Sequence, residues 1–93
     1  MHYILIEKKA REYLQKLPIK TRRIIVGKIQ ELSVNPYPGS NKEKLECYNS
    51  PVVYRLHISR SYTVFYLIDE EKEVVKIEKI ETIEKAHKTY SRR

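Results

Sequence analysis

The chain has 93 residues, of which 41% are hydrophobic and 33% are charged, and its formal net charge is +7. This length and composition predict a single globular domain over residues 1–93, without room for a second domain or a deep cofactor cleft. One cysteine, Cys47, excludes an internal disulfide and fits a reducing, cytoplasmic compartment. Neither a signal peptide nor a membrane span is predicted, since no stretch approaches the roughly 18 apolar residues that a span needs.

The first half of the chain predicts one strand and two helices. Residues 2–6 form a short apolar run with β-branched and aromatic side chains, which is typical of a strand. Residues 7–15 follow helical periodicity, and Pro18 ends that helix. Apolar residues at helical spacing predict a second helix over residues 20–34. The two helices are therefore expected to form a hairpin.

The second half of the chain predicts a sheet. Residues 35–41, Asn-Pro-Tyr-Pro-Gly-Ser-Asn, form a strong loop signal, after which the apolar residues alternate. Strands are predicted over residues 52–59, 62–69 and 74–81, and the short turns between them predict an antiparallel meander. The predicted fold is an α+β domain of order β-α-α-β-β-β, with the helical hairpin packed on a small antiparallel sheet.

The positive charge is unevenly distributed along the chain. Residues 1–28 carry eight basic and two acidic side chains, and residues 85–93 carry four basic and no acidic ones. Residues 69–84 carry three basic and seven acidic side chains. Basic patches attract phosphates by releasing counterions, so this distribution indicates a nucleic-acid partner. The alternatives are a merely solvated charged surface, a membrane surface and an acidic protein partner.

No metal-binding or phosphate-cradling motif is visible. The three histidines are scattered, and Gly27 and Gly39 are the only glycines. We therefore expect no metal and no cofactor. Cys47 and His57 offer a cysteine nucleophile, but a lone cysteine more commonly acts as a small, partly buried hydrophobe.

The strand predicted over residues 52–59 is the most informative segment. One of its faces is apolar, whereas the other carries Arg55 and His57 about 7 Å apart. A cation beside a titratable imidazole can bind an anion and exchange a proton. The alternative is an ordinary sheet surface that faces solvent.

Residues 54–66, Tyr-Arg-Leu-His-Ile-Ser-Arg-Ser-Tyr-Thr-Val-Phe-Tyr, resemble the central strand pair of the RelE/ParE toxin superfamily. That signature has an aromatic residue, alternating basic residues, a short turn, Tyr-Arg, and an apolar strand that ends in tyrosine. Lys44-Leu45-Glu46 resembles the Lys-Leu run before it, and Tyr90 matches a tyrosine near the C-terminus. The resemblance covers nearly the whole chain, in the family's own order of helices and strands.

The resemblance implies a toxin of a type II toxin–antitoxin system. Its RelE branch consists of ribosome-dependent endoribonucleases, which cleave mRNA in the A site by metal-independent attack of a 2′-OH on the adjacent phosphate. The implied partners are a cognate antitoxin, acidic and partly disordered when free, the ribosome and mRNA, with no membrane. The alternatives are a ParE-like inhibitor of DNA gyrase and a non-catalytic member that binds RNA or only an antitoxin.

The family's motif assigns roles to three residues of this sequence. Arg55 would stabilise the phosphate, and His57 would act as base or acid, because the ordinary pKa of histidine lies near neutrality. Tyr90 would stack on a base or exchange a proton. An ordinary tail tyrosine that packs on the sheet is the alternative for Tyr90.

Two positions depart from the family's pattern. Thr63 stands where the family has arginine, and Glu84 falls on or next to a basic position of the family. Arg60, in the turn just before Thr63, is expected to compensate for the first loss, and Lys85 is the cation nearest to Glu84. The basic residues expected to contact the RNA backbone more generally are Lys42, Lys44, Lys88, Arg92 and Arg93.

Overall fold

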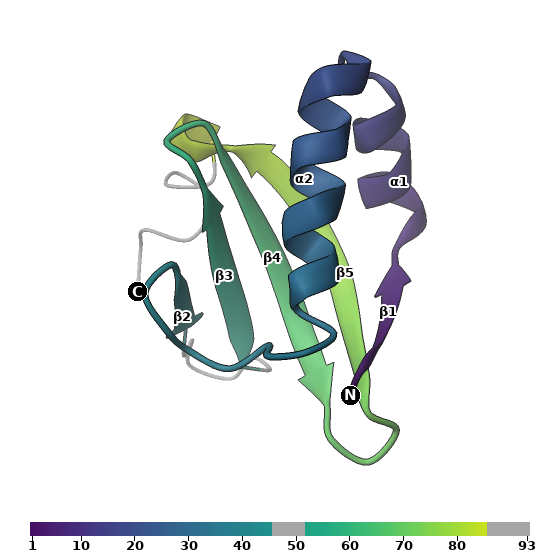
Figure 1. The fold of residues 1–93 in the computed structure, drawn as a ribbon, viewed down its shortest axis with the longest axis vertical. Helices are drawn as coiled ribbons and strands as arrows, with labels where there is room; N and C mark the ends of the chain where they lie inside the picture. The colour runs from purple at the N-terminus through teal and green to yellow at the C-terminus, as the bar shows by residue number, and fades with distance from the viewer. Residues whose placement is uncertain (46–51, 86–93) are drawn as a thin grey trace.

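The computed structural model describes residues 1–45 and 52–85. Two helices lie on one face of a five-stranded sheet (Figure 1). The helices and strands are, in chain order, β1 (Tyr3–Ile6), α1 (Lys8–Gln15), α2 (Ile19–Glu31), β2 (Lys42–Leu45), β3 (Val53–Ile58), β4 (Tyr62–Asp69) and β5 (Val74–Thr82). The predicted α+β class, the helical hairpin and the three-stranded meander are confirmed.

The sheet is mixed, with strand order β1-β5-β4-β3-β2. The pairs β3–β4 and β4–β5 are antiparallel, as expected for a meander. The sequence predicted an antiparallel sheet. β1 instead runs parallel to β5, so the sheet is mixed. A parallel pair needs a long connection, and here almost the whole domain connects the two strands. Because the pairing is so distant in the sequence, no local pattern predicts it.

β2 is a further difference, since the sequence did not predict this edge strand. Its residues are Lys-Glu-Lys-Leu, and only Leu45 among them is buried. Short edge strands rich in charge are common because they resist pairing with other chains. β2 pairs antiparallel with β3 and places Glu43 opposite Arg55. The strand therefore brings a carboxylate to the residues that the sequence singled out.

Arg22 ties the two helices of the hairpin together. Its guanidinium donates hydrogen bonds to the carbonyl oxygens of Leu14, Gln15 and Leu17, at 3.0, 3.1 and 3.2 Å. These carbonyls lie at or just beyond the C-terminal end of α1, where a helix leaves its carbonyl groups unpaired. Arg22 therefore has a structural role, unlike the exposed cations beside it on α2.

The main core lies between the helices and the sheet. Its buried residues are Ala10, Leu14, Ile25, Ile29, Leu32, Leu56, Ile58, Val64, Tyr66, Val75, Ile77 and Ile80. Tyr66 is fully buried, and its hydroxyl donates a hydrogen bond to the carbonyl oxygen of Pro36 at 2.7 Å. Burial, with a smaller effect of Tyr54, raises the pKa of Tyr66 well above its ordinary value. The hydroxyl therefore stays protonated and anchors the loop after α2.

We call the side of the sheet opposite the helices the open face. It carries a small apolar cluster of Leu45, Val53 and Phe65, with Leu67 packed against it. A β-bulge in β5 decides which charged residues reach this face: Phe65 pairs with Lys79, whereas the next residue, Tyr66, pairs with Ile77. Strict alternation along β5 would put Lys79 on the same face as the buried Ile77. The extra residue, Glu78, shifts the alternation and turns Lys79 to the open face.

Candidate active site

Arg55 and His57 lie on the open face, on alternate positions of β3, as the sequence predicted. Glu43 is the Cα partner of Arg55 on β2, and Thr63 is that of His57 on β4. Alternate residues of a strand share a face, and directly paired residues lie close together across it. The sheet therefore builds a compact polar group from three strands.

One carboxylate oxygen connects the two basic residues. Oε2 of Glu43 accepts a hydrogen bond from Nη2 of Arg55 at 2.7 Å and lies 3.2 Å from Nε2 of His57. The Arg55 side chain is 19% exposed, that of His57 35%, and that of Glu43 48%, so the group is open to solvent on one side. The hydrogen bonds from Arg55 and then His57 lower the pKa of Glu43. Glu43 is therefore ionised at neutral pH.

One hydrogen-bond donor of Arg55 has no partner among the described residues. This donor is the guanidinium Nε, which is buried. A guanidinium can donate in a fork to two oxygens of a carboxylate or phosphate, and here only Nη2 is bound to a carboxylate. A buried unpaired donor is costly in a folded protein. Arg55 is thus incompletely satisfied by its own chain.

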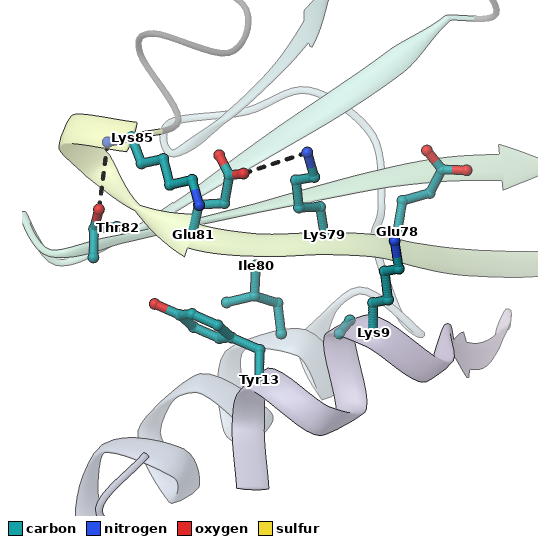
Figure 2. Close-up of a pocket in the computed structure, with 9 residues that line it drawn as sticks. Lys9, Tyr13, Glu78, Lys79, Ile80, Glu81, Thr82 and Lys85 are labelled. Carbon is teal, nitrogen blue, oxygen red and sulfur yellow. Dashed lines mark hydrogen bonds and ion pairs between the residues drawn. The ribbon is translucent and has the colours of Figure 1, made fainter. Parts of the chain in front are cut away.

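A second acidic–basic pair lies on β5. Nζ of Lys79 is 3.4 Å from Oε2 of Glu81, and Glu81 is the Cα partner of the buried Thr63. Figure 2 shows Lys79 and Glu81 on one side of β5, with Tyr13 of α1 on the other. The Lys79 side chain is half exposed, whereas Glu81 is buried. These two pairs place Arg55, His57 and Lys79 on the open face together with the carboxylates of Glu43 and Glu81.

A pocket of about 170 Å³ lies between α1 and β5, beside this second pair. Ala10, Tyr13 and Ile80 contribute its apolar lining, and Figure 2 shows Lys85, which also lines it, on the same side of β5 as Glu81. The backbone N–H of Lys85 donates a hydrogen bond to the Thr82 hydroxyl at 3.3 Å, which starts the helical turn after β5.

Two further described residues of the predicted catalytic set, Arg60 and Lys85, lie in turns and not on the strand that carries Arg55 and His57. Arg60 is exposed in the β3–β4 turn, and Lys85 lies in the turn after β5. These turns are adjacent, because the N–H of Ile83 donates a hydrogen bond to the carbonyl oxygen of Ser61 at 2.9 Å. Arg60 is three residues beyond His57 and lies in the turn that follows the end of β3 at Ile58. The described residues of the predicted catalytic set are therefore divided between one face of β3 and two adjacent turns.

Lys42 and Lys44 lie on the opposite side of β2 from Glu43. They pair with Leu56 and Tyr54, which face the helices. The Lys42 ammonium donates a hydrogen bond to the carbonyl oxygen of Asn35 at 2.6 Å. The predicted RNA-contacting lysines of β2 are therefore separated from Arg55 and His57 by the sheet. Tyr90, Lys88, Arg92, Arg93 and Cys47 lie outside the described residues.

The sequence did not indicate Glu43, Lys79 or Glu81. Glu43 could not be placed beside Arg55 from the sequence, because the strand β2 that carries it was not predicted. Lys79 and Glu81 had a signal in the three-residue spacing between Ile77 and Ile80, which breaks the alternation of a strand and is typical of a bulge. In residues 1–45 and 52–85, no three acidic, histidine or cysteine side chains gather as metal ligands would. In the same residues, no helix has the length and apolar character to cross a membrane.

The contribution of Glu43 to stability should depend on pH. Its pKa is lowered in the folded state, so its stabilising effect is present above the ordinary glutamate value of about 4.3 and is lost as the pH falls through the folded value. We expect the free energy of unfolding of the wild type to exceed that of Glu43→Gln near neutrality. This difference should shrink below about pH 4. Urea unfolding of both proteins across the acidic range measures it.

Glu71→Gln, in the exposed β4–β5 turn, controls for the loss of one negative charge. A wild-type advantage over Glu43→Gln that persists in strong acid would contradict the assignment, because the carboxylate is then protonated.

Comparisons with known proteins agree with this fold. The family model described as "ParE toxin of type II toxin-antitoxin system, parDE" matches residues 4–84. No curated protein sequence matches the chain. Among solved structures, the chain is similar to the toxin of the archaeal RelE–RelB complex from Pyrococcus horikoshii. That match has a TM-score of 0.74 and 26% identity, and covers 87% of this chain and 93% of the other.

Two further structures show the same fold. The RelBE2 toxin–antitoxin complex of Mycobacterium tuberculosis matches with a TM-score of 0.74 and 22% identity, over 87% of this chain and 96% of the other. The isolated RelE toxin of E. coli matches with a TM-score of 0.70 and 20% identity, over 96% of this chain and 98% of the other. The family model covers most of the sequence, and the sheet and helical hairpin agree with these toxins. The chain belongs to the family of ParE toxins of type II toxin–antitoxin systems, within the RelE/ParE superfamily.

Proposed function

We propose that this toxin is a ribosome-dependent endoribonuclease that cleaves mRNA by metal-independent attack of a 2′-OH on the adjacent phosphate. The observation that carries the proposal is the convergence of Arg55 and His57 on one oxygen of Glu43, at 2.7 and 3.2 Å. Carboxylate and phosphate oxygens accept hydrogen bonds from the same charged donors at similar distances. Two donors held around a single anionic oxygen therefore support a phosphate site on the open face.

The proposed reaction forms a bond between the 2′ oxygen and phosphorus and breaks the bond from phosphorus to the 5′ oxygen. A base takes the 2′-OH proton, cations balance the charge on the phosphate, and an acid protonates the leaving 5′ oxygen. We assign phosphate binding to Arg55 and one proton transfer to His57. Tyr90, outside the described residues, is proposed for the other. Glu43 would orient the His57 ring by accepting its N–H, as a carboxylate does for other catalytic histidines.

Lys79 is proposed to replace the arginine that is missing at Thr63. Thr63 is buried and pairs with Glu81, and the Lys79 ammonium lies 3.4 Å from that carboxylate, with half of its side chain exposed. A cation on the neighbouring strand can thus supply charge close to the position of the family's arginine. Arg60 and Lys85, at the end of the sheet, are better placed for the flanking RNA backbone.

The shape of the open face supports a role for the ribosome. Arg55, His57 and Lys79 project from a sheet surface and are partly exposed, so they do not enclose a substrate. Holding the 2′-OH in line with the phosphate accounts for a large part of such a reaction's rate, and the ribosome would supply that positioning.

The toxin is also proposed to bind a cognate antitoxin in the cytoplasm. The Pyrococcus horikoshii and Mycobacterium tuberculosis relatives are toxins in complex with antitoxins. A net charge of +7 favours an acidic partner, because charge complementarity speeds association and fixes orientation.

Inhibition of DNA gyrase is the second candidate function, since the matching family model is that of ParE toxins. It would use the same fold without nuclease chemistry. Arg55 and His57 would then bind a protein or DNA surface and transfer no proton.

Induction of the toxin in cells, followed by primer extension on a defined mRNA, separates these functions. We expect cuts inside the codons of translated message, absent when translation is blocked, with intact chromosomal DNA. Uncut message with broken DNA would replace the proposal with gyrase inhibition. Uncut message with intact DNA and normal growth would indicate a non-catalytic member, for which Thr63 and Glu84 would be the physical reason.

A further inference from the structure

A small apolar socket lies away from the open face, between α2 and the β3–β4 turn. Its volume is about 130 Å³. Ile25 and Ile58 are buried in its floor, and Ile24 and Tyr62 contribute to its walls. Ile24 is 50% exposed although it is a large aliphatic residue. A cavity of about 150 Å³ accepts a benzene-sized group, so the socket has room for one aliphatic side chain.

The rim of the socket is polar and includes a strained residue. Thr21 of α2 and the turn residues Ser59 and Ser61 bring hydroxyl groups to the rim. Ser59 has a φ of 55°, which is unfavourable for a residue other than glycine. Glu73, in the β4–β5 turn, has the same φ, so this conformation belongs to the hairpin turns, and the hydroxyl groups are what makes the rim polar. The rim can therefore hydrogen-bond to the backbone of a bound segment.

Three exposed cations are close in sequence to residues that line the socket. Lys20 is one helical turn before Ile24 on the same side of α2, Arg23 is next to Ile24, and Arg60 lies between the two serines of the turn. No carboxylate within residues 1–45 and 52–85 forms an ion pair with any of the three. Lys20 also lies in the first turn of α2, where the helix dipole disfavours a cation. Their charge is not balanced within the described chain.

We propose that this socket docks an acidic peptide segment of a partner protein, with one aliphatic side chain inserted between α2 and the β3–β4 turn. The cations select for acidic residues on both sides of the inserted side chain. Apolar anchors in small pockets, surrounded by polar contacts, are typical of protein–protein interfaces. The RNA backbone, in contrast, requires the cations but not the apolar floor.

The partner's identity as an antitoxin rests on the function proposed above, whereas the binding of such a segment does not. The socket includes Ile58 and Tyr62, which face the helices at the end of the β3–β4 pair, whereas His57, the residue before Ile58, faces the open side of the sheet. An antitoxin that uses the socket would thus be anchored between α2 and the β3–β4 turn, independently of any contact with Arg55.

The test uses the whole toxin and a short synthetic peptide of aspartate and glutamate residues with one central leucine. A matched peptide has asparagine in place of the leucine. Titration followed by NMR should shift the amide signals of Thr21, Ile24, Ser59, Ser61 and Tyr62. The leucine peptide should bind at least about tenfold more tightly, because only it buries an aliphatic side chain.

Three variants complete the test. Ile24→Ser should weaken binding of the leucine peptide and leave that of the asparagine peptide unchanged, whereas Arg23→Ala should weaken both. Lys72→Ala removes the same charge at the opposite end of the sheet and should weaken neither. Equal affinity for the two peptides, or signal shifts elsewhere, would overturn the proposal. So would binding of single-stranded RNA at the socket with an affinity that Ile24→Ser does not change.

The outcome is separate from that of the primer-extension experiment. A toxin that cuts no message can still bind the peptide, and Ile24→Ser is expected to leave mRNA cleavage unchanged.

Discussion

Replacing Arg55 with alanine is expected to lower the rate of mRNA cleavage by about 10²–10³-fold, the usual cost of removing one fixed donor to a developing oxyanion. Arg55 is the donor closest to the anionic oxygen of Glu43, and its side chain is largely buried, so it is held in position before substrate binds. The change should also leave His57 as the remaining one of the two basic residues that contact the Glu43 carboxylate. Single-turnover cleavage of a defined mRNA on programmed ribosomes, with toxin in excess, measures the effect.

Arg55→Lys and Lys72→Ala serve as matched variants. Lysine keeps the positive charge but lacks the forked guanidinium. The cleavage rate of Arg55→Lys should therefore lie between that of the wild type and that of Arg55→Ala. Lys72 lies in the β4–β5 turn, far from the site, and its loss should not change the rate. Each variant's urea-unfolding midpoint shows whether it is folded. A folded Arg55→Ala variant with wild-type cleavage would remove Arg55 from the mechanism.

The largest effect on stability is expected from Ile25→Ala, which should lower the free energy of unfolding by about 2–5 kcal/mol. Ile25 is fully buried where α2 packs on the sheet, so truncation removes buried apolar surface and leaves a cavity. Urea unfolding monitored by circular dichroism gives the change directly. A loss of this size is a large part of the total stability of a small domain.

Ile24→Ala is the matched control, since it makes the same chemical change at the neighbouring residue of the same helix. Ile24 is half exposed, and its truncation should cost less than about 1 kcal/mol. Equal losses from the two variants would mean that α2 does not pack on the sheet as described.

The acidic residues of the site show where local patterns are insufficient. Arg55 and His57 could be placed on one strand face because their spacing matches the period of a strand. Glu43 could not, because β2 has three charged residues among four, and it is a strand only through its pairing with β3. The predicted basic face is therefore a face of paired charges. This pairing lowers the pKa of Glu43 and orients the two residues proposed for chemistry.

The position of Lys79 was also not predicted from the sequence, in this case because of a β-bulge. A bulge inserts one residue in β5 opposite Phe65 and Tyr66, and this insertion decides whether Lys79 faces the helices or the open face. Arg60 and Lys85, which the sequence offered as replacements for missing cations, belong to adjacent turns at the end of the sheet. Lys79 lies on the open face itself, opposite Phe65, and for this reason we propose that it replaces the arginine absent at Thr63.

By itself, the sequence determined the helical hairpin, the meander and the face that Arg55 and His57 share, because helical and strand periodicity act over neighbouring residues. Only the tertiary structure decided the parallel pairing of β1 with β5, the edge strand β2, the carboxylate between Arg55 and His57, and the socket beside Ile24. Each of these joins segments distant in the chain. Their energies come from pairing and burial between such segments, which no local pattern of residues records.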